Sequence, residues 1–228
     1  MSTLDTLIEN NLHSKDTELK LHLGCGTQYL KGYVNIDYPV SEHTVVPPIV
    51  DAHGDITILD FPDNSVDEIK LLHVYEHFDR VAALVLLIKW HSWLKIDGVL
   101  TIETPDILES AKQLASDISY EQKMAIVRHL EGDQAAKWAS HIGQWWDERF
   151  ENTLSKLGFH ITTMDHSQWT RWPYLSNVTV TATKLRNIDL ETQIEQSCLL
   201  LKDSMVSASE DKTFAVWERE LRKGLGVL

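Results

Sequence analysis

One short strand that ends in a glycine turn limits the fold of this chain more than any other feature. The run Leu19–Leu23 alternates apolar and polar residues and leads directly into Gly24-Cys25-Gly26. A second strand-like run, Tyr33–Ile36, ends at Asp37. Glycines at a strand end let backbone N–H groups approach a ligand closely, and a carboxylate at the next strand end can accept hydrogen bonds from both hydroxyls of a ribose. This order of features is typical of a mononucleotide-binding α/β fold.

The rest of the chain alternates strand-like and helix-like segments. A leading helix is expected within residues 1–17, and a strand over Val45–Val50, which Pro47 and Pro48 keep short or at an edge. Strands that alternate with helices predict a parallel sheet with helices on both faces. Further strands are expected over 66–74, 99–103, 159–164 and 177–183, and further helices over 80–94, 107–118 and 146–157.

Composition and charge exclude several classes of protein. The chain has 228 residues, with 21 Lys and Arg against 34 Asp and Glu, a formal net charge of −13. Sequence-independent nucleic-acid binding requires an excess of basic residues, which this chain does not have. Its negative charge also does not suit binding to an anionic membrane surface. The longest apolar run, Val81–Ile88, is far shorter than the roughly 20 residues that span a bilayer. We therefore expect neither a nucleic-acid partner nor a membrane partner.

The cysteines and the first residues bear on location. Cys25 and Cys198 are the only cysteines, which excludes a disulfide scaffold and a multi-cysteine zinc site and fits a reducing compartment. Met1–Asp5 lacks a basic segment followed by an apolar stretch, so no signal peptide is expected. The sequence thus predicts a cytoplasmic protein, and we expect no metal site.

Four longer segments that follow the glycine turn also carry information about the family. They are 61–69 (FPDNSVDEI), 73–78 (HVYEHF), 94–106 (LKIDGVLTIETPD) and 146–159, which ends in Gly158-Phe159. Together with 21–37 they resemble class I S-adenosylmethionine-dependent methyltransferases, most closely the bacterial branch that often accompanies glycosyltransferases in surface-glycan biosynthesis. The resemblance covers roughly residues 19–183. It implies a Rossmann-like seven-stranded sheet, mostly parallel with the last strand antiparallel.

The resemblance also implies a cofactor and its binding residues. The cofactor is S-adenosylmethionine, with Gly24 and Gly26 passing its methionine part and Asp37 binding its ribose. Asp51, expected at the end of a third strand, frames the adenine together with Ala52. Cys25 lies beside the cofactor as a small residue that fits, and His73 faces it from the end of the fourth strand.

Two positions depart from the family pattern. His22 stands where the family usually has an acidic residue, and Gln28 replaces the third glycine of Gly-x-Gly-x-Gly. We expect the first change to weaken binding of the cofactor amine and the second to alter how the turn meets the following helix. A non-catalytic cofactor-binding protein on the same fold therefore stays open as an alternative, because fold does not fix function.

His73 is the first candidate for a general base. Methyl transfer to a hydroxyl benefits from a base, most often histidine, and a neutral imidazole near pH 7 suits that role. The other reading makes His73 a pocket wall or core residue. His77, His141 and Asp106 are further catalytic candidates, although for His77 and His141 a structural role is the more common one. We expect O-methylation of a small-molecule or glycan hydroxyl.

The segment after the fourth strand argues against two methyltransferase classes and raises one rival. It has neither the Asn/Asp-Pro-Pro-aromatic turn of amino-methyltransferases acting on bases nor the cysteine of cytosine-C5 enzymes. The rival is a zinc hydrolase, because His73-x-x-Glu76-His77 matches the H-x-x-E-H pattern. That chemistry needs both histidines on one helical face, whereas residues 66–74 read as a strand.

Clustered tryptophans and the tail complete the picture. The candidate acceptor-binding residues are Trp145, Trp146 and Trp172, with Arg171. Tryptophans at these positions are equally consistent with a role in the core.

We divide the chain into a methyltransferase domain at 1–186 and a helical extension at 187–228. An apolar stripe in that extension packs on the domain or on a second copy in a homodimer, and the sequence leaves both open. The stripe is Ile194, Cys198, Leu201 and Met205.

Overall fold

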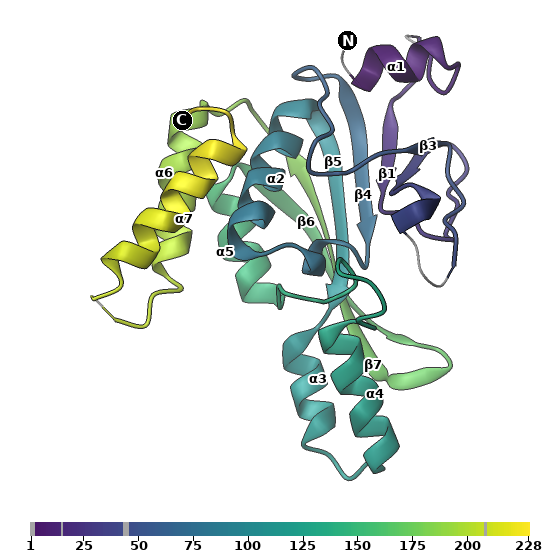
Figure 1. Ribbon diagram of the computed structural model, residues 1–228, viewed down its shortest axis with the longest axis vertical. Helices are drawn as coiled ribbons and strands as arrows, with labels where there is room; N and C mark the ends of the chain where they lie inside the picture. Colours follow the sequence, from purple (N-terminus) through teal and green to yellow (C-terminus); the bar gives the residue numbers. More distant parts are fainter. Residues whose placement is uncertain (1–2, 15, 43–45, 208) are drawn as a thin grey trace.

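A seven-stranded sheet with one reversed strand organises the structure, a computed structural model that describes residues 3–14, 16–42, 46–207 and 209–228. The strand order is β3-β2-β1-β4-β5-β7-β6, and only β7 runs antiparallel to its neighbours (Figure 1). β2 lies on one side of β1 and β4 lies on the other, so the direction in which the sheet is built reverses between β1 and β4. The carboxyl ends of these two strands therefore form the topological switch point, where ligands bind in such sheets. The strands are β1 (Lys20–Leu23), β2 (Val34–Asp37), β3 (Ala52–His53), β4 (Val66–Leu72), β5 (Leu94–Pro105), β6 (Phe159–Trp169) and β7 (Trp172–Lys184).

Helices flank this sheet, mostly from the second half of the chain. α2 is apolar on nearly all sides because it lies between the sheet and the two carboxyl-terminal helices (Figure 1). The Asp79 carboxylate begins it by accepting hydrogen bonds from the N–H groups of Val81 and Ala82. The helices are α1 (Thr3–Glu9), α2 (Arg80–Trp93), α3 (Ile107–Leu114), α4 (Tyr120–Glu131), α5 (Asp147–Lys156), α6 (Leu190–Lys202) and α7 (Asp211–Gly224), with 3-10 turns η1 (Val40–Glu42) and η2 (Tyr75–His77).

The predicted fold class is confirmed: a mostly parallel seven-stranded sheet, a reversed last strand, flanking helices and a carboxyl-terminal helical region. In that region, Ile194 and Leu201 of α6 and Leu221 of α7 are buried in the main core. The tail stripe thus packs on α2 and α5 of the same chain. Whether a second copy also binds there stays a prediction.

The first two strand connections differ from our expectation of alternating strands and helices. Residues 24–33, between β1 and β2, form a loop. The Asn35 side chain stabilises that loop, because its Oδ1 accepts from the Leu30 N–H at 2.9 Å and its Nδ2 donates to the Leu30 carbonyl at 3.0 Å. Flanking helices on the described connections therefore begin only after β4.

The expected strand over Val45–Val50 is wrong where it can be judged. Val45 lies outside the described residues, and 46–50 form no strand. The third strand is instead the short Ala52–His53, after Pro47 and Pro48. Proline has no N–H for a sheet ladder, so pairing with β2 starts only beyond the two prolines.

Helix α4 was not expected from the sequence. It begins at a capping box in which the Ser119 hydroxyl accepts from the Gln122 N–H and the Gln122 side chain accepts from the Ser119 N–H. The spacing Ser-x-x-Gln is the sequence signal that marks this start. α4 packs beside α3 beyond the end of β5 (Figure 1), around a small separate core of Ile126, Leu130 and Leu175.

No helix in the described parts of the chain is both long enough and apolar enough to cross a bilayer.

We predict that the stacked pair formed by Trp145 and Phe150 is a main source of stability. Phe150 is fully buried, and its ring stacks on Trp145 with centroids 4.7 Å apart. Phe150→Ala should lower the free energy of unfolding by about 3–5 kcal/mol, because it leaves a cavity in a packed core. Urea denaturation measures this change. The control Tyr120→Ala, at a 72% exposed aromatic, should change it by less than about 0.5 kcal/mol; equal losses would contradict the assignment.

Candidate functional site

The turn after β1 is pressed against two neighbouring strand ends. Gly24 has a φ of +68° and its N–H donates to the Ile36 carbonyl at 2.8 Å. A Cβ on Gly24 would lie 2.5 Å from Cγ2 of Val74, so no side chain fits between this turn and the end of β4. Gly26 has a φ of +52°, but a Cβ there would meet nothing within 4 Å. One glycine thus allows close packing, and the other leaves an open approach to its backbone.

Asp37 holds this turn from the end of β2. Its Oδ2 accepts a hydrogen bond from the Gly26 N–H at 2.6 Å, and its Oδ1 accepts from the Tyr38 N–H at 2.6 Å. The residue is 8% exposed. Backbone donors therefore fix the orientation of the carboxylate while its edge stays accessible.

These groups open into one cavity of about 610 Å³, which we call the strand-end cavity. Six of the residues predicted from the sequence line it: Gly24, Cys25, Gly26, Asp37, His73 and His77. The sequence analysis missed other lining residues, among them Tyr38, Gly54, Ile56 and Thr57. Tyr38 follows Asp37 directly and could have been found from that position. Trp138, one of the clustered tryptophans of the second half of the chain, also lines the cavity.

Cys25 lies in this wall as a buried, inert thiol. It is 3% exposed, and burial raises the pKa of its thiol to about 12. A thiol with that pKa stays protonated at neutral pH and is not a nucleophile. Its small size, which lets it fit beside the turn, is the relevant property.

Asp51 and Ala52 do not line the strand-end cavity, contrary to their expected place beside a ligand. The Asp51 Oδ2 accepts from the backbone and side-chain N–H groups of Asn35 at 2.8 and 2.9 Å, and its Oδ1 accepts from the Tyr29 hydroxyl at 2.9 Å. The reason is that Asp51 precedes β3 instead of ending it. The cavity wall on this side comes from Gly54–Thr57, after the strand.

His73 is held between two carboxylates at the end of β4. Its φ is +57°, its Nδ1 lies 3.3 Å from Oε1 of Glu76, and its Nε2 lies 3.4 Å from Oε1 of Glu103. Burial lowers the pKa of His73, but Glu103 and Glu76 more than offset this and raise it to about 9. The expected neutral imidazole near pH 7 is therefore wrong, and His73 is poorly suited to be a free base.

The β6–β7 hairpin brings aromatic rings next to His73. The Trp169 ring lies 5.8 Å from the His73 ring and 5.3 Å from that of His129. Trp172 follows at 5.7 Å from Trp169, and the Arg171 guanidinium lies 4.9 Å from the centre of the Trp172 ring. Trp172 and Arg171 thus form the exposed side of this aromatic group, although neither lines the strand-end cavity.

Trp145 and Trp146 lie elsewhere. Trp145 is 2% exposed and packs between Tyr75 and Phe150, so it is a core residue and not an accessible acceptor-binding one. Trp146 immediately precedes α5 and, together with Trp145, lines a separate cavity of about 970 Å³ between α2, α5 and α6. Neither tryptophan shares the strand-end cavity, because the chain turns away from it before α5.

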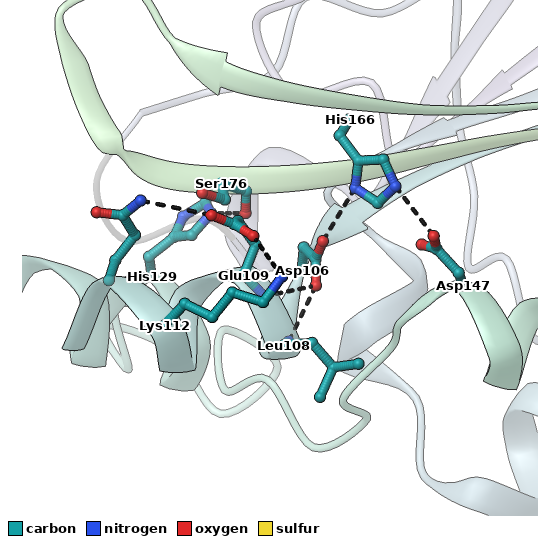
Figure 2. A network of polar contacts seen from close by, with 9 residues as sticks. Asp106, Leu108, Glu109, Lys112, His129, Asp147, His166 and Ser176 are labelled. Carbon is teal, nitrogen blue, oxygen red and sulfur yellow. Dashed lines mark hydrogen bonds and ion pairs between the residues drawn. The ribbon is translucent and has the colours of Figure 1, made fainter. Parts of the chain in front are cut away.

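Asp106 belongs to a network on the β6 side of the sheet. Figure 2 shows its carboxylate at the start of α3, where Oδ1 accepts from the N–H groups of Leu108 and Glu109. Its Oδ2 lies 3.1 Å from Nδ1 of His166, whose Nε2 lies 3.0 Å from Oδ2 of Asp147. These contacts place Asp106 outside the lining of the strand-end cavity and occupy both of its oxygens.

His141 is packed behind His77. The two rings lie 4.6 Å apart and nearly perpendicular, and His141 Nε2 lies 3.8 Å from Oε1 of Glu76. Burial lowers the pKa of His141 to about 4, so its imidazole is neutral near pH 7. The arrangement expected of an H-x-x-E-H helix is absent here, because η2 covers only Tyr75–His77 and His73 precedes it in a left-handed conformation.

Comparisons with known proteins support the fold. No protein family model and no curated protein sequence matches the chain. A chain from the complex of the Haloferax volcanii Trm112 methyltransferase activator with a proposed methyltransferase is 13% identical, with a TM-score of 0.52 over 80% of this chain and 90% of that one. This likeness shows a shared fold.

Two further solved structures are less similar in shape. A SAM-dependent methyltransferase from Methanosarcina mazei is 17% identical, with a TM-score of 0.46 over 79% of this chain and 98% of that one. The Burkholderia thailandensis 1,6-didemethyltoxoflavin-N1-methyltransferase, solved with 1,6-didemethyltoxoflavin and S-adenosylhomocysteine, is 14% identical, with a TM-score of 0.49 over 74% of this chain and 72% of that one.

We predict that the two glycines of the turn respond differently to alanine. Both substitutions place a side chain in the left-handed region, which costs roughly 1–2 kcal/mol. Only Gly24→Ala adds the clash with Val74, worth about 1–3 kcal/mol more. Urea denaturation of Gly24→Ala and Gly26→Ala should therefore show the larger loss for Gly24→Ala. Equal losses would mean that Gly24 and Val74 are not in the close contact described.

Proposed function

We propose that this chain is an S-adenosylmethionine-dependent methyltransferase. The observation that carries the proposal is that the Gly24–Gly26 turn and the Asp37 carboxylate open into a single cavity at the carboxyl ends of β1 and β4. In sheets of this order, that edge is where nucleotide-like ligands bind. Two of the segments that resemble class I methyltransferases, 21–37 and 73–78, contribute residues to this cavity.

The residues of the cavity fit the parts of this cofactor. The Asp37 carboxylate is the group that would accept hydrogen bonds from the ribose hydroxyls. Gly26 would let the amino-acid part pass close to the backbone, since a Cβ there meets nothing within 4 Å. Tyr38, Ile56 and Trp138 supply aromatic and apolar surface for a planar base. A cavity of about 610 Å³ lies within the roughly 300–1,000 Å³ typical of such sites.

Methyl transfer asks the protein mainly to align the two reactants. When bound, S-adenosylmethionine supplies the electrophilic methyl group, and alignment of the acceptor accounts for much of the rate. In this chain, His73 would be a positioning residue, because Glu76 and Glu103 occupy the surroundings of both ring nitrogens. Its contacts with these two carboxylates would hold the wall at the end of β4 in place.

We further propose that the acceptor is a hydroxyl of a small molecule or a glycan, and that the enzyme works in the cytoplasm. Two features support this acceptor class. The segment after β4 lacks the residues used by amino-methyltransferases acting on bases. The exposed aromatic group of Trp169 and Trp172, with Arg171 beside it, offers flat faces for a sugar or another polyol. The link to glycan biosynthesis rests on the sequence resemblance alone.

A second candidate function is cofactor binding without catalysis. The observation that favours it is His22, which replaces the family's acidic residue, is fully buried and points its Nδ1 at Oδ1 of Asn35 at 3.1 Å. That side chain therefore stabilises the loop after β1 and does not face the strand-end cavity, whose lining excludes it.

We predict that Asp37→Ala abolishes high-affinity binding of S-adenosylhomocysteine. Hydrogen bonds to a charged group contribute about 1.5–3 kcal/mol each, so losing them should raise Kd by at least about tenfold to a hundredfold. Isothermal titration calorimetry measures this change. Asp165→Ala, at an exposed aspartate on β6, is the matched control and should leave Kd unchanged. Retained affinity in Asp37→Ala would refute the proposed ribose site.

We also predict turnover, which separates the two candidate functions. Protein incubated with S-adenosylmethionine and a pool of small hydroxyl compounds and oligosaccharides should release S-adenosylhomocysteine and yield a product heavier by one methylene group. Mass spectrometry detects both. Trp172→Ala should reduce turnover at low acceptor concentration while leaving S-adenosylhomocysteine affinity unchanged. Binding without turnover across all pools would instead favour the non-catalytic function.

A further inference from the structure

A buried carboxylate without a hydrogen-bond partner lies behind the strand-end cavity. Glu76 is 1% exposed, and among the described residues neither of its side-chain oxygens has a hydrogen-bond partner. Its ionic neighbour His73, at 3.3 Å, is shared with a second carboxylate, Glu103. Two carboxylates thus share one histidine as their neighbour, and the Glu76 side chain is almost fully buried. Burying a carboxylate charge is costly unless a positive group compensates it.

Two histidines complete a compact set of metal-ligand atoms with Glu76. One nitrogen each of His77 and His141 and one oxygen of Glu76 all lie within 4.8 Å of one another. His77 lies in η2 and His141 lies in the loop before α5, two segments that are far apart in the sequence. This convergence is built by tertiary structure and is not a short local motif.

The backbone around the set is fixed. The carbonyl of Glu76 accepts hydrogen bonds from the N–H groups of Ile142 and Gly143, both at 2.8 Å. These bonds hold the loop that carries His141 against η2. His77 Nδ1 lies 3.2 Å from the carbonyl of Ser140 and donates to it, so the lone pair is left on Nε2. Metal-binding histidines typically show such a hydrogen bond from the other ring nitrogen.

We propose that Glu76, His77 and His141 bind a divalent transition-metal ion of the zinc class. Two imidazole nitrogens and one carboxylate oxygen are a ligand set that zinc takes with one position left open. The ion would also give the buried Glu76 carboxylate a partner, which its oxygens lack among the described residues. This set differs from the H-x-x-E-H reading, in which the ligands are His73 and His77. It also stands apart from the proposed methyl transfer, because it needs no cofactor.

The ion would brace one wall of the strand-end cavity. His77 lines that cavity, and so do Trp138 and Ala139, which directly precede the loop of His141. A bond from the ion to both η2 and this loop would hold the wall in place. The structure assigns the ion a bracing role, and its removal should loosen the segment 133–141.

A second group of similar composition provides the control. Asp106, Asp147 and His166 also lie close enough to hold an ion. There, however, His166 contacts both carboxylates at hydrogen-bond distance, and the His166 and Asp147 side chains are 49% and 45% exposed. Because His166 already contacts both carboxylates, this group does not require a cation to pair with them.

Metal content of the tag-free chain, expressed with added Zn²⁺ and dialysed, tests the proposal. Inductively coupled plasma mass spectrometry should find about one zinc per chain in the wild type and in His166→Ala. In Glu76→Gln and His141→Ala the affinity for zinc should fall further. Removal of an outer-shell partner typically costs roughly tenfold to hundredfold in metal affinity, and these variants should lose more than that. Zn²⁺ should raise the thermal unfolding temperature of the wild type and of His166→Ala only.

Two results would overturn the proposal. The first is less than a tenth of an equivalent of zinc in the folded wild type, together with no effect of Zn²⁺ on its unfolding temperature. The second is zinc that disappears in His166→Ala and persists in Glu76→Gln. Because the wild type alone decides the first result, a variant that fails to fold leaves the proposal testable. Binding of S-adenosylhomocysteine, measured in parallel, tells failure of this site from failure of the proposed function.

Discussion

The site depends on the close contact between the turn after β1 and the end of β4. Gly24 fits against Val74 only because it has no side chain, and its N–H is at the same time bonded to the Ile36 carbonyl of β2. Three neighbouring strand ends are thus locked at one point. Asp37 then fixes Gly26 from the side. The strand-end cavity follows from this arrangement, because the open side of Gly26, the Asp37 carboxylate and the His73 wall all face the same space.

Charge sets what the wall at β4 can do. The imidazole of His73 is enclosed by Glu76 and Glu103, which come from a different turn and a different strand. Their carboxylates raise its pKa to about 9 despite burial, so the ring is protonated and rigid where a base was expected. On its other side, Glu76 lies close to His77 and His141, and its oxygens have no hydrogen-bond partner among the described residues. Glu76 therefore belongs both to the surroundings of His73 and to the inferred cation site.

The features that are best predicted from the sequence are those that a short-range residue pattern determines. The strand before Gly24, the glycine turn and the Asp37 strand end follow from alternation and from glycine chemistry, and the structure has all three. Residues whose place depends on distant contacts could not be found this way. Asp51 bonds Asn35 and does not line the strand-end cavity, because β3 starts later than expected. Trp145 is buried by rings from η2 and α5. Helix α4 does have a local signal in the sequence, the Ser119–Gln122 capping box.

The central claim is that the strand-end cavity holds S-adenosylmethionine with its ribose on Asp37. A crystal structure of the chain soaked or co-crystallised with S-adenosylhomocysteine tests it most directly. The account predicts electron density for the ligand along Gly24–Gly26, with its ribose hydroxyls within hydrogen-bond distance of the Asp37 carboxylate. Density only in the cavity beside Trp146, or a ribose bound away from Asp37, would contradict it.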